Sequence, residues 1–104
     1  MAKSIMQTEK ECFVCGTTYG LELHHCIYGT ANRKLSDKYG LTIWLCNAHH
    51  TQNGSGIHFN KDLDAHVKKL AQERFEAVHE PNTRFIDVFG RNYNSISRRS
   101  YEND

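Results

Sequence analysis

The sequence lacks an apolar stretch long enough to cross a membrane, and its first residues contain no apolar run followed by a small-residue cleavage site. Nothing therefore suggests export, and we expect a cytoplasmic protein whose cysteines stay reduced. The chain also lacks internal repeats, low-complexity tracts and any linker long enough to divide its 104 residues, so we expect a single domain.

Hydrophobic content and net charge are both low. Hydrophobic residues make up 38% of the chain, which predicts a small core that would gain from a metal or another cross-link. The formal net charge is only +1, so the charge of the whole chain does not indicate a nucleic-acid-binding protein. Contact with a polyanion would need a local basic cluster or a bound cation.

In contrast, the chain is rich in side chains that bind metals, with four cysteines and seven histidines. Cys12 and Cys15 form a Cys-x2-Cys pair, and Cys46 and His49 form a Cys-x2-His pair after a gap of 30 residues. This double spacing predicts a closed tetrahedral zinc site, which is structural because it leaves no position for water. Alternatively, Cys12 and Cys15 are a redox pair or small buried residues. Cys26 is expected to be buried and apolar in character.

The hydrophobic pattern predicts an α+β fold with two short strands and a long packing helix. Apolar residues recur at helical spacing from Leu63 to Val78, Asn60 or Asp62 can cap this helix, and Pro81 stops it. The expected strands span 19–28 and 41–45, and the expected helices span 62–80 and 83–89. A short helical turn closed by Gly40 is expected within 30–39, and one or two helical turns within 47–53.

The ends of the chain are polar and carry little periodicity. We expect residues 1–11 to form a flexible lead-in, residues 12–90 to form the folded domain, and residues 91–104 to form a polar tail.

Two pairs of adjacent histidines, His24-His25 and His49-His50, occur about one hairpin apart. With His49 assigned to zinc, His50 at the start of a helical turn would face the first strand, where it could meet His24 and His25. Alternation along a strand sends neighbouring side chains to opposite faces, so His24 and His25 can share one site only at a strand end, a bulge or a twisted point. The alternative is a half-buried pair, with one histidine in the core and one in water.

A basic cluster lies in the polar segment between the strands. Arg33, Lys34 and Lys38 surround Asp37 there. They could contact phosphate groups, or they could belong to an ordinary solvated loop.

Over residues 12–58, the order and spacing of these motifs resemble the HNH endonucleases, the ββα-metal or His-Me finger group. In zinc-bearing members the order along the chain is a Cys-x2-Cys pair, a strand that ends in an acidic residue or His followed by His, a second strand, and then Cys-x2-Cys-His. Here His49 takes the place of the last cysteine. The small size, the segment 54–60 and the ending 89–93 are similar to small phage or prophage HNH proteins. The resemblance implies a ββα-metal finger with a structural zinc knuckle and a long C-terminal packing helix.

Carried over position by position, the resemblance implies that His25 is the general base and that His24 and His50 are ligands of a catalytic divalent ion. His58 is a candidate third ligand or a contact to the scissile phosphate. The middle asparagine of the HNH pattern has no obvious counterpart, and the nearby candidates are Asn32, Asn47 and Asn53.

The implied activity is a metal-dependent DNA endonuclease of little sequence specificity, with structural Zn²⁺ and catalytic Mg²⁺, Mn²⁺ or Ni²⁺. The residue types suit this chemistry, because a neutral imidazole can take a proton from water at neutral pH and a divalent ion can polarise a phosphate. Two alternatives stay open. One is a non-catalytic zinc module that binds nucleic acid or protein. The other is an accessory nuclease subunit of a phage packaging or recombination complex, active beside a phage protein partner.

Overall fold

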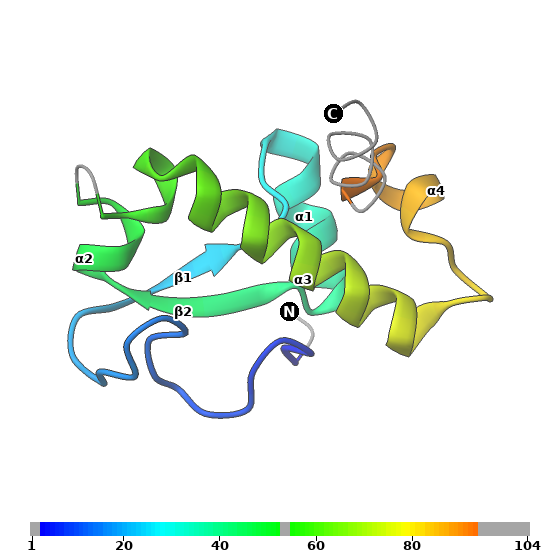
Figure 1. Cartoon of the computed structure of the whole chain (residues 1–104). Coiled ribbons are helices and arrows are strands. Elements are labelled where there is room, and N and C mark those ends of the chain that lie inside the picture. Colours follow the sequence, from blue (N-terminus) through cyan, green and yellow to red (C-terminus); the bar gives the residue numbers. More distant parts are fainter. Residues whose placement is uncertain (1–2, 53–54, 94–104) are drawn as a thin grey trace.

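The computed structural model describes residues 3–52 and 55–93. The fold is α+β, as predicted, with a small antiparallel sheet and helices around it (Figure 1). The elements in chain order are β1 (Leu21–His25), α1 (Thr30–Tyr39), β2 (Thr42–Cys46), α2 (Asn47–His50), the 3₁₀ turn η1 (Ile57–Phe59), α3 (Lys61–His79) and α4 (Phe85–Phe89).

The two strands pair along their whole length, with Leu21 opposite Cys46 and His25 opposite Thr42. Both strands lie within or next to their predicted ranges, although β1 is shorter than expected. The chain leaves the sheet after His25 because the backbone polar groups of Ile27 are taken up elsewhere. The Ser36 hydroxyl donates to the Ile27 carbonyl (2.7 Å) and accepts from the Ile27 N–H (3.3 Å).

The polar segment between the strands forms a ten-residue helix, α1, which is longer than the short helical turn expected there. Ser36 faces inward from this helix and is fully buried. Its bonds to Ile27 tie α1 to the end of β1. Leu35 and Tyr39 pack against the core from the same helix, and Gly40 ends it in the left-handed conformation. The second half of α1 is therefore tied to the end of β1.

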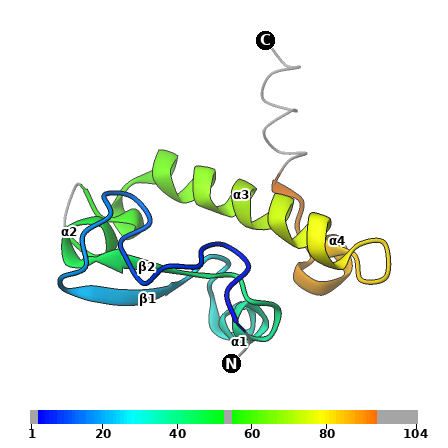
Figure 2. The ribbon, with the colours of Figure 1, turned by 90° about the horizontal axis from the view of Figure 1, so that it is seen from below.

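α3 is the predicted long helix, and it begins and ends one residue earlier than expected. The Asn60 side chain caps it by accepting from the Leu63 N–H (3.0 Å). Figures 1 and 2 show α3 lying across the sheet as a second layer, with α1 in the layer of the sheet. The two cysteine-containing knuckles lie together at the end of the sheet where β2 leads into α2.

The buried row of α3 runs at intervals of four residues through Val67, Ala71 and Phe75. The next member of the row is His79, whose ring lies 4.7 Å from that of Phe75. Val78, which the periodicity placed on the apolar face, is turned out of this row and is 54% exposed. The row places His79 among aromatic rings, those of Phe75 and Tyr39.

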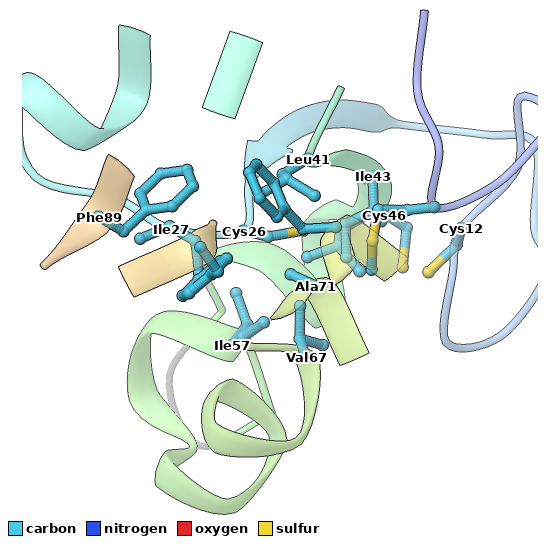
Figure 3. Packing of buried hydrophobic residues seen from close by; sticks show 14 residues of the cluster. Cys12, Cys26, Ile27, Leu41, Ile43, Cys46, Ile57, Val67, Ala71 and Phe89 are labelled. Carbon is cyan, nitrogen blue, oxygen red and sulfur yellow. The ribbon is translucent and has the colours of Figure 1, made fainter. Parts of the chain in front are cut away.

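The core is one cluster between the sheet and α3, extended by the aromatic rings of α4. Figure 3 shows that Ile57 and Val67 lie on one side of it, and that Cys12 and Cys46 lie together at one end. Phe85 and Phe89 of α4 pack their rings against Phe75 of α3, at centroid distances of 5.4 and 6.1 Å. The cysteine end of the core is thus the end that a metal could close.

Residues 3–11 contain no helix or strand, but they are hydrogen-bonded along β2. The Ser4 hydroxyl donates to the Thr42 carbonyl (2.7 Å), and the Gln7 side chain accepts from the Trp44 N–H (2.6 Å). This differs from the flexible lead-in expected over residues 1–11. Polar side chains bind this segment to β2, and they leave no periodic apolar pattern in the sequence. Gln7 satisfies a backbone donor on the open edge of the sheet.

After α4 the chain returns to α3 through a buried glutamine. The Gln72 side chain, 2% exposed, accepts from the Tyr93 N–H (2.7 Å). Of the predicted polar tail, residues 94–104 lie outside the described residues. Within residues 3–52 and 55–93, no helix is both long and apolar enough to cross a membrane.

Candidate functional site

The four predicted zinc ligands lie together although they come from distant parts of the chain. The Sγ atoms of Cys12, Cys15 and Cys46 and a ring nitrogen of His49 all lie within 4.8 Å of one another. The Sγ atoms of Cys15 and Cys46 are 3.8 Å apart, and His49 Nδ1 lies 3.3 Å from Cys46 Sγ and 3.7 Å from Cys12 Sγ. This Cys₃His cluster could hold a metal ion.

These separations fit zinc. Zn–S bonds of about 2.3 Å in a tetrahedron place sulfur atoms about 3.8 Å apart, whereas sulfurs joined in a disulfide are about 2.05 Å apart. All four cysteines are free thiols. Burial raises the pKa of Cys12, but hydrogen bonds from the backbone of Cys46, Cys15 and Val14 outweigh it and bring that pKa down to about 6. A thiol that ionises readily is prepared to bind a cation.

The local fold explains how the cysteines reach one another. A tight turn brings Cys12 and Cys15 to the same side, with the Gly16 N–H donating to the Cys12 carbonyl (2.8 Å). The Phe13 N–H then donates to the Trp44 carbonyl (2.8 Å), which fixes this turn against β2. Cys26 is fully buried away from the cluster, and burial raises the pKa of its thiol, as expected for an apolar, non-ligating cysteine.

A second cluster consists of three histidines from β1, α2 and η1. Ring nitrogens of His24, His50 and His58 lie within 4.8 Å of one another. His50 Nε2 and His58 Nε2 are 3.2 Å apart, and the three ring centroids are 4.9–5.3 Å from each other. Two nitrogens bound to one ion at about 2.1 Å lie about 3.0–3.4 Å apart in octahedral or tetrahedral geometry. The His50–His58 pair therefore has the spacing of two ligands of one ion, and the His24 ring nitrogen lies near enough to be a candidate third ligand.

The surroundings of this cluster favour neutral imidazole rings. His24 is 2% exposed, and its Nε2 atom has no hydrogen-bond partner among the described residues. Burial, together with the neighbouring His50 and His58, lowers the pKa of His24 to about 3. Burial likewise lowers the pKa of His58. Neutral imidazoles with free lone pairs are the form that binds a metal ion.

His58 reaches the other two histidines because the chain folds back over α2. Gly56 lies so close to this helix that a Cβ atom on it would stand 2.7 Å from the His50 carbonyl oxygen. Ile57, 1% exposed, then anchors η1 in the core. His58 follows directly and is itself exposed, so the cluster is closed on the His24 side and open on the His58 side. An ion held there would keep positions for water or substrate.

Glu22 orients His50. Its Oε1 atom lies 2.5 Å from His50 Nδ1, which leaves His50 Nε2 directed at His58. Asn47, with its amide nitrogen turned toward Glu22, donates to Glu22 Oε2 (3.1 Å) and to the Gly20 carbonyl (3.2 Å). A carboxylate behind the free nitrogen of a ligand histidine is the usual outer support of a metal site.

His25 points away from the three-histidine cluster and pairs with Asp37 of α1. His25 Nε2 lies 2.8 Å from Asp37 Oδ1. Strand alternation accounts for this, since neighbouring strand residues face opposite sides. The His25 side chain is 15% exposed, at the strand end. A proton on Nε2 held by Asp37 leaves Nδ1 as the nitrogen that can accept another.

One pocket of about 310 Å³ nevertheless joins His25 to the three histidines. Its lining is Leu23, His24, His25, Tyr28, Gly29, Arg33, His50 and His58. A proton acceptor and a metal-type cluster thus open on the same space, which meets the first geometric requirement for hydrolytic chemistry.

The structure brings together some of the predicted basic and amide residues and separates others. Arg33 lines the histidine pocket and, with Lys34, a neighbouring hollow, whereas the Lys38 ammonium lies 5.3 Å from the Tyr39 ring. Asn32 donates to the Tyr28 carbonyl (3.5 Å), and Asn47 supports Glu22. Neither is bonded to His25, and Asn53 lies outside the described residues.

Two carboxylates of the site were missed by sequence reasoning. Asp37 was noted only as a negative charge among cations, and Glu22 was not singled out at all. Glu22 is two residues before His24 on the same strand, and Asp37 is one residue after the buried Ser36, but their partners are fixed by tertiary contact. No signal in the sequence identifies either pairing.

No protein-family model matches the chain, and neither do the curated proteins or the solved structures. The assignment of function therefore depends on the chemistry of the site itself.

Replacing Glu22 with Gln tests its support of the histidine cluster. We expect a ten- to hundredfold loss of affinity for Mn²⁺ at the three-histidine cluster, with no change in zinc at the Cys₃His cluster, because outer-shell partners of ligand histidines contribute about that much. Calorimetric titration with Mn²⁺ measures the affinity, and Glu73→Gln, an exposed residue of α3, is the control. Equal Mn²⁺ affinity in Glu22→Gln and the unsubstituted chain would remove Glu22 from this role.

Proposed function

We propose that the protein is a metal-dependent phosphodiester hydrolase, an endonuclease of the HNH type that acts on DNA. One observation supports this most directly: the three clustered histidines share a pocket with a histidine–aspartate pair. The paired strands β1 and β2, joined through α1 and followed by α2, are compatible with a ββα-metal finger, and the Cys₃His cluster is compatible with its structural zinc knuckle.

In this proposal, His24, His50 and His58 hold the divalent ion. That ion would supply positive charge to polarise the scissile phosphate and to stabilise the departing oxygen. A set of three imidazoles suits Mn²⁺, Ni²⁺ or Zn²⁺ better than Mg²⁺, which prefers oxygen ligands. Glu22 and the folded-back segment at Gly56 keep two of the three ligands in place.

His25 is the general base in this proposal. Asp37 holds the Nε2 proton, so Nδ1 takes a proton from the attacking water as the new P–O bond forms. One P–O ester bond breaks, and the departing oxygen takes a proton from solvent. In this proposal, Asp37 orients His25 and so takes the role of the middle asparagine of the HNH pattern. Proton transfer by a placed histidine contributes about 10²- to 10⁴-fold to such reactions.

Plasmid nicking by the purified chain tests the proposal. After mild EDTA treatment that leaves one zinc per chain, we expect no cleavage, and we expect Mn²⁺ or Ni²⁺ to restore it. His58→Ala should need at least tenfold more Mn²⁺ for half-maximal nicking, because one of three ligands is lost.

The zinc content of His58→Ala should stay at one per chain, since His58 is not part of the Cys₃His cluster. His66→Ala is the matched control, because His66 is an exposed histidine of α3 outside both clusters. Zinc-loaded protein that never cleaves DNA with any of these ions would favour a non-catalytic zinc module instead.

A further inference from the structure

The three clustered histidines are held in place in different ways, and His58 has the weakest support. His24 is buried in the core, and Glu22 binds the ring nitrogen of His50 that faces away from the cluster. The His58 side chain is exposed. Its ring has one polar contact among the described residues, the 3.2 Å contact between His58 Nε2 and His50 Nε2. Some other contact must therefore orient the His58 ring.

The ring of Tyr28 makes such a contact. Tyr28 lies just after β1 and lines the histidine pocket. Its ring lies edge-on to the rings of His58 and His24, at centroid distances of 5.3 and 5.8 Å. Edge-to-face ring pairs have a preferred geometry, so a fixed Tyr28 ring would limit the positions that the His58 ring can take.

Tyr28 is itself fixed from α3. Its hydroxyl donates to Asp64 Oδ2 (3.1 Å), and Lys68 Nζ lies 2.9 Å from the same oxygen. The Lys68 ammonium also lies 4.5 Å from the centre of the Tyr28 ring, at cation–π distance. The side chains of Asp64 and Lys68 are only 16% and 20% exposed, so salt screens this ion pair less than a pair on the open surface.

These contacts connect two segments that are distant in the sequence. η1 carries His58 and leads into α3, which carries Asp64 and Lys68. Tyr28 belongs to the loop after β1, the strand that carries His24. The bond between Tyr28 and Asp64 therefore joins the strand of the buried histidine to the segment of the exposed one.

We propose that Tyr28 is a positioning residue of the metal site, which is held by Asp64 and Lys68 and fixes the His58 ring where it binds the ion. This inference rests on the proposed function, because it concerns the metal site of the same reaction. A ligand that is oriented before the ion arrives loses less freedom on binding, and the affinity is higher for that reason. Since Tyr28 acts through His58, its effect on metal affinity should disappear when His58 is absent.

A double-mutant cycle tests this inference. Calorimetric titration of the zinc-loaded full chain with Ni²⁺ gives the affinity of the three-histidine cluster, and imidazole ligands bind Ni²⁺ tightly enough for weakened variants to be measured. Tyr28→Leu should bind Ni²⁺ about tenfold more weakly than the unsubstituted chain, at the upper end of what an aromatic pair contributes. The double variant Tyr28→Leu/His58→Ala should bind within about twofold of His58→Ala.

Two further variants make the test specific. Tyr19→Leu is the matched control, because Tyr19 is 82% exposed and does not line the histidine pocket, and it should bind Ni²⁺ as tightly as the unsubstituted chain. Tyr28→Phe keeps the ring and removes only the hydrogen bond to Asp64, so we expect about a threefold loss. If Tyr28→Leu fails to fold, Tyr28→Phe takes its place in the cycle. Unchanged affinity in the folded Tyr28 variant, or a loss of equal size with and without His58, would overturn the inference.

This inference and the proposed function fail in different ways. Plasmid nicking by a chain in which the Tyr28 variants bind Ni²⁺ normally would leave the nuclease and remove the role of Tyr28. Coupling between Tyr28 and His58 in a chain that never cleaves DNA would keep the role of Tyr28 at the metal site and remove the hydrolase.

Discussion

Cys46→Ser is expected to unfold the protein under conditions in which the unsubstituted chain is folded. Cys46 is 7% exposed, ends β2, and its Sγ lies within 3.8 Å of both Cys15 Sγ and His49 Nδ1. Loss of this thiolate removes one of four ligands and leaves a hydroxyl in its place. Zinc binding in small structural sites contributes about 10–16 kcal/mol of apparent free energy, comparable to the whole stability of a typical domain.

The small core makes this dependence severe. The sheet has only two strands, and such a sheet is marginal without further packing. The cluster joins the turn at Cys12 and Cys15 to the end of β2, so loss of an ion there would leave only a few hydrogen bonds between the N-terminal segment and the sheet. We therefore expect loss of soluble protein, or a melting transition lowered by tens of degrees.

Circular dichroism melts and zinc analysis of the same samples measure this effect. Cys26→Ala is the matched control, because Cys26 is buried but outside the cluster, and it should keep one zinc and melt as a cooperative unit. Its melting temperature should fall only by the modest amount typical of a small change in a core. Cys46→Ser protein that retains one tightly held zinc and its melting temperature would show that this cluster is not the zinc site.

The spacing of residues along the chain was enough to predict the first cluster. A Cys-x2-Cys pair and a Cys-x2-His pair each need one tight turn, and both turns form locally, at Gly16 and at the start of α2. Only the contact between the two pairs depends on tertiary structure. It forms because β2, which ends at Cys46, lies against the turn that contains Cys12 and Cys15. The same reasoning placed His24 near His50, because they belong to neighbouring elements.

The outer contacts could not be predicted, because they depend on rotamers and packing rather than on spacing. Glu22 reaches His50 across the end of the sheet, and Asp37 reaches His25 from a helix whose length was underestimated. Strand alternation raised the question of whether His24 and His25 could share a site. In the structure, the His24 ring faces His50 and His58 and the His25 ring faces Asp37, yet both histidines line one pocket.

The two clusters are coupled through adjacent residues of α2. His49 belongs to the Cys₃His cluster and His50 to the three-histidine cluster. An ion at the first cluster fixes the backbone of this four-residue helix and therefore the position of His50 Nε2. In physical terms, the structural metal would set the geometry of the second site, and variants of the first cluster should be assayed for folding before activity is interpreted.

His25→Ala is expected to abolish nicking while leaving the fold and both metal clusters intact. His25 is a ligand of neither cluster, and its side chain is partly exposed at the end of β1, so truncation costs little stability. Loss of the proton acceptor should reduce the rate about 10²- to 10⁴-fold. Nicking rates at saturating Mn²⁺, with zinc content and Mn²⁺ affinity measured on the same protein, separate a lost base from a lost metal.

Asp37→Asn gives the intermediate case that identifies Asp37 as a positioning residue. The amide oxygen can still accept from His25 Nε2, but the negative charge that stabilises the protonated ring is gone. We expect a nicking rate between those of the unsubstituted chain and His25→Ala, with unchanged Mn²⁺ affinity and an altered dependence of rate on pH. Equal rates for all three proteins would remove His25 as the base.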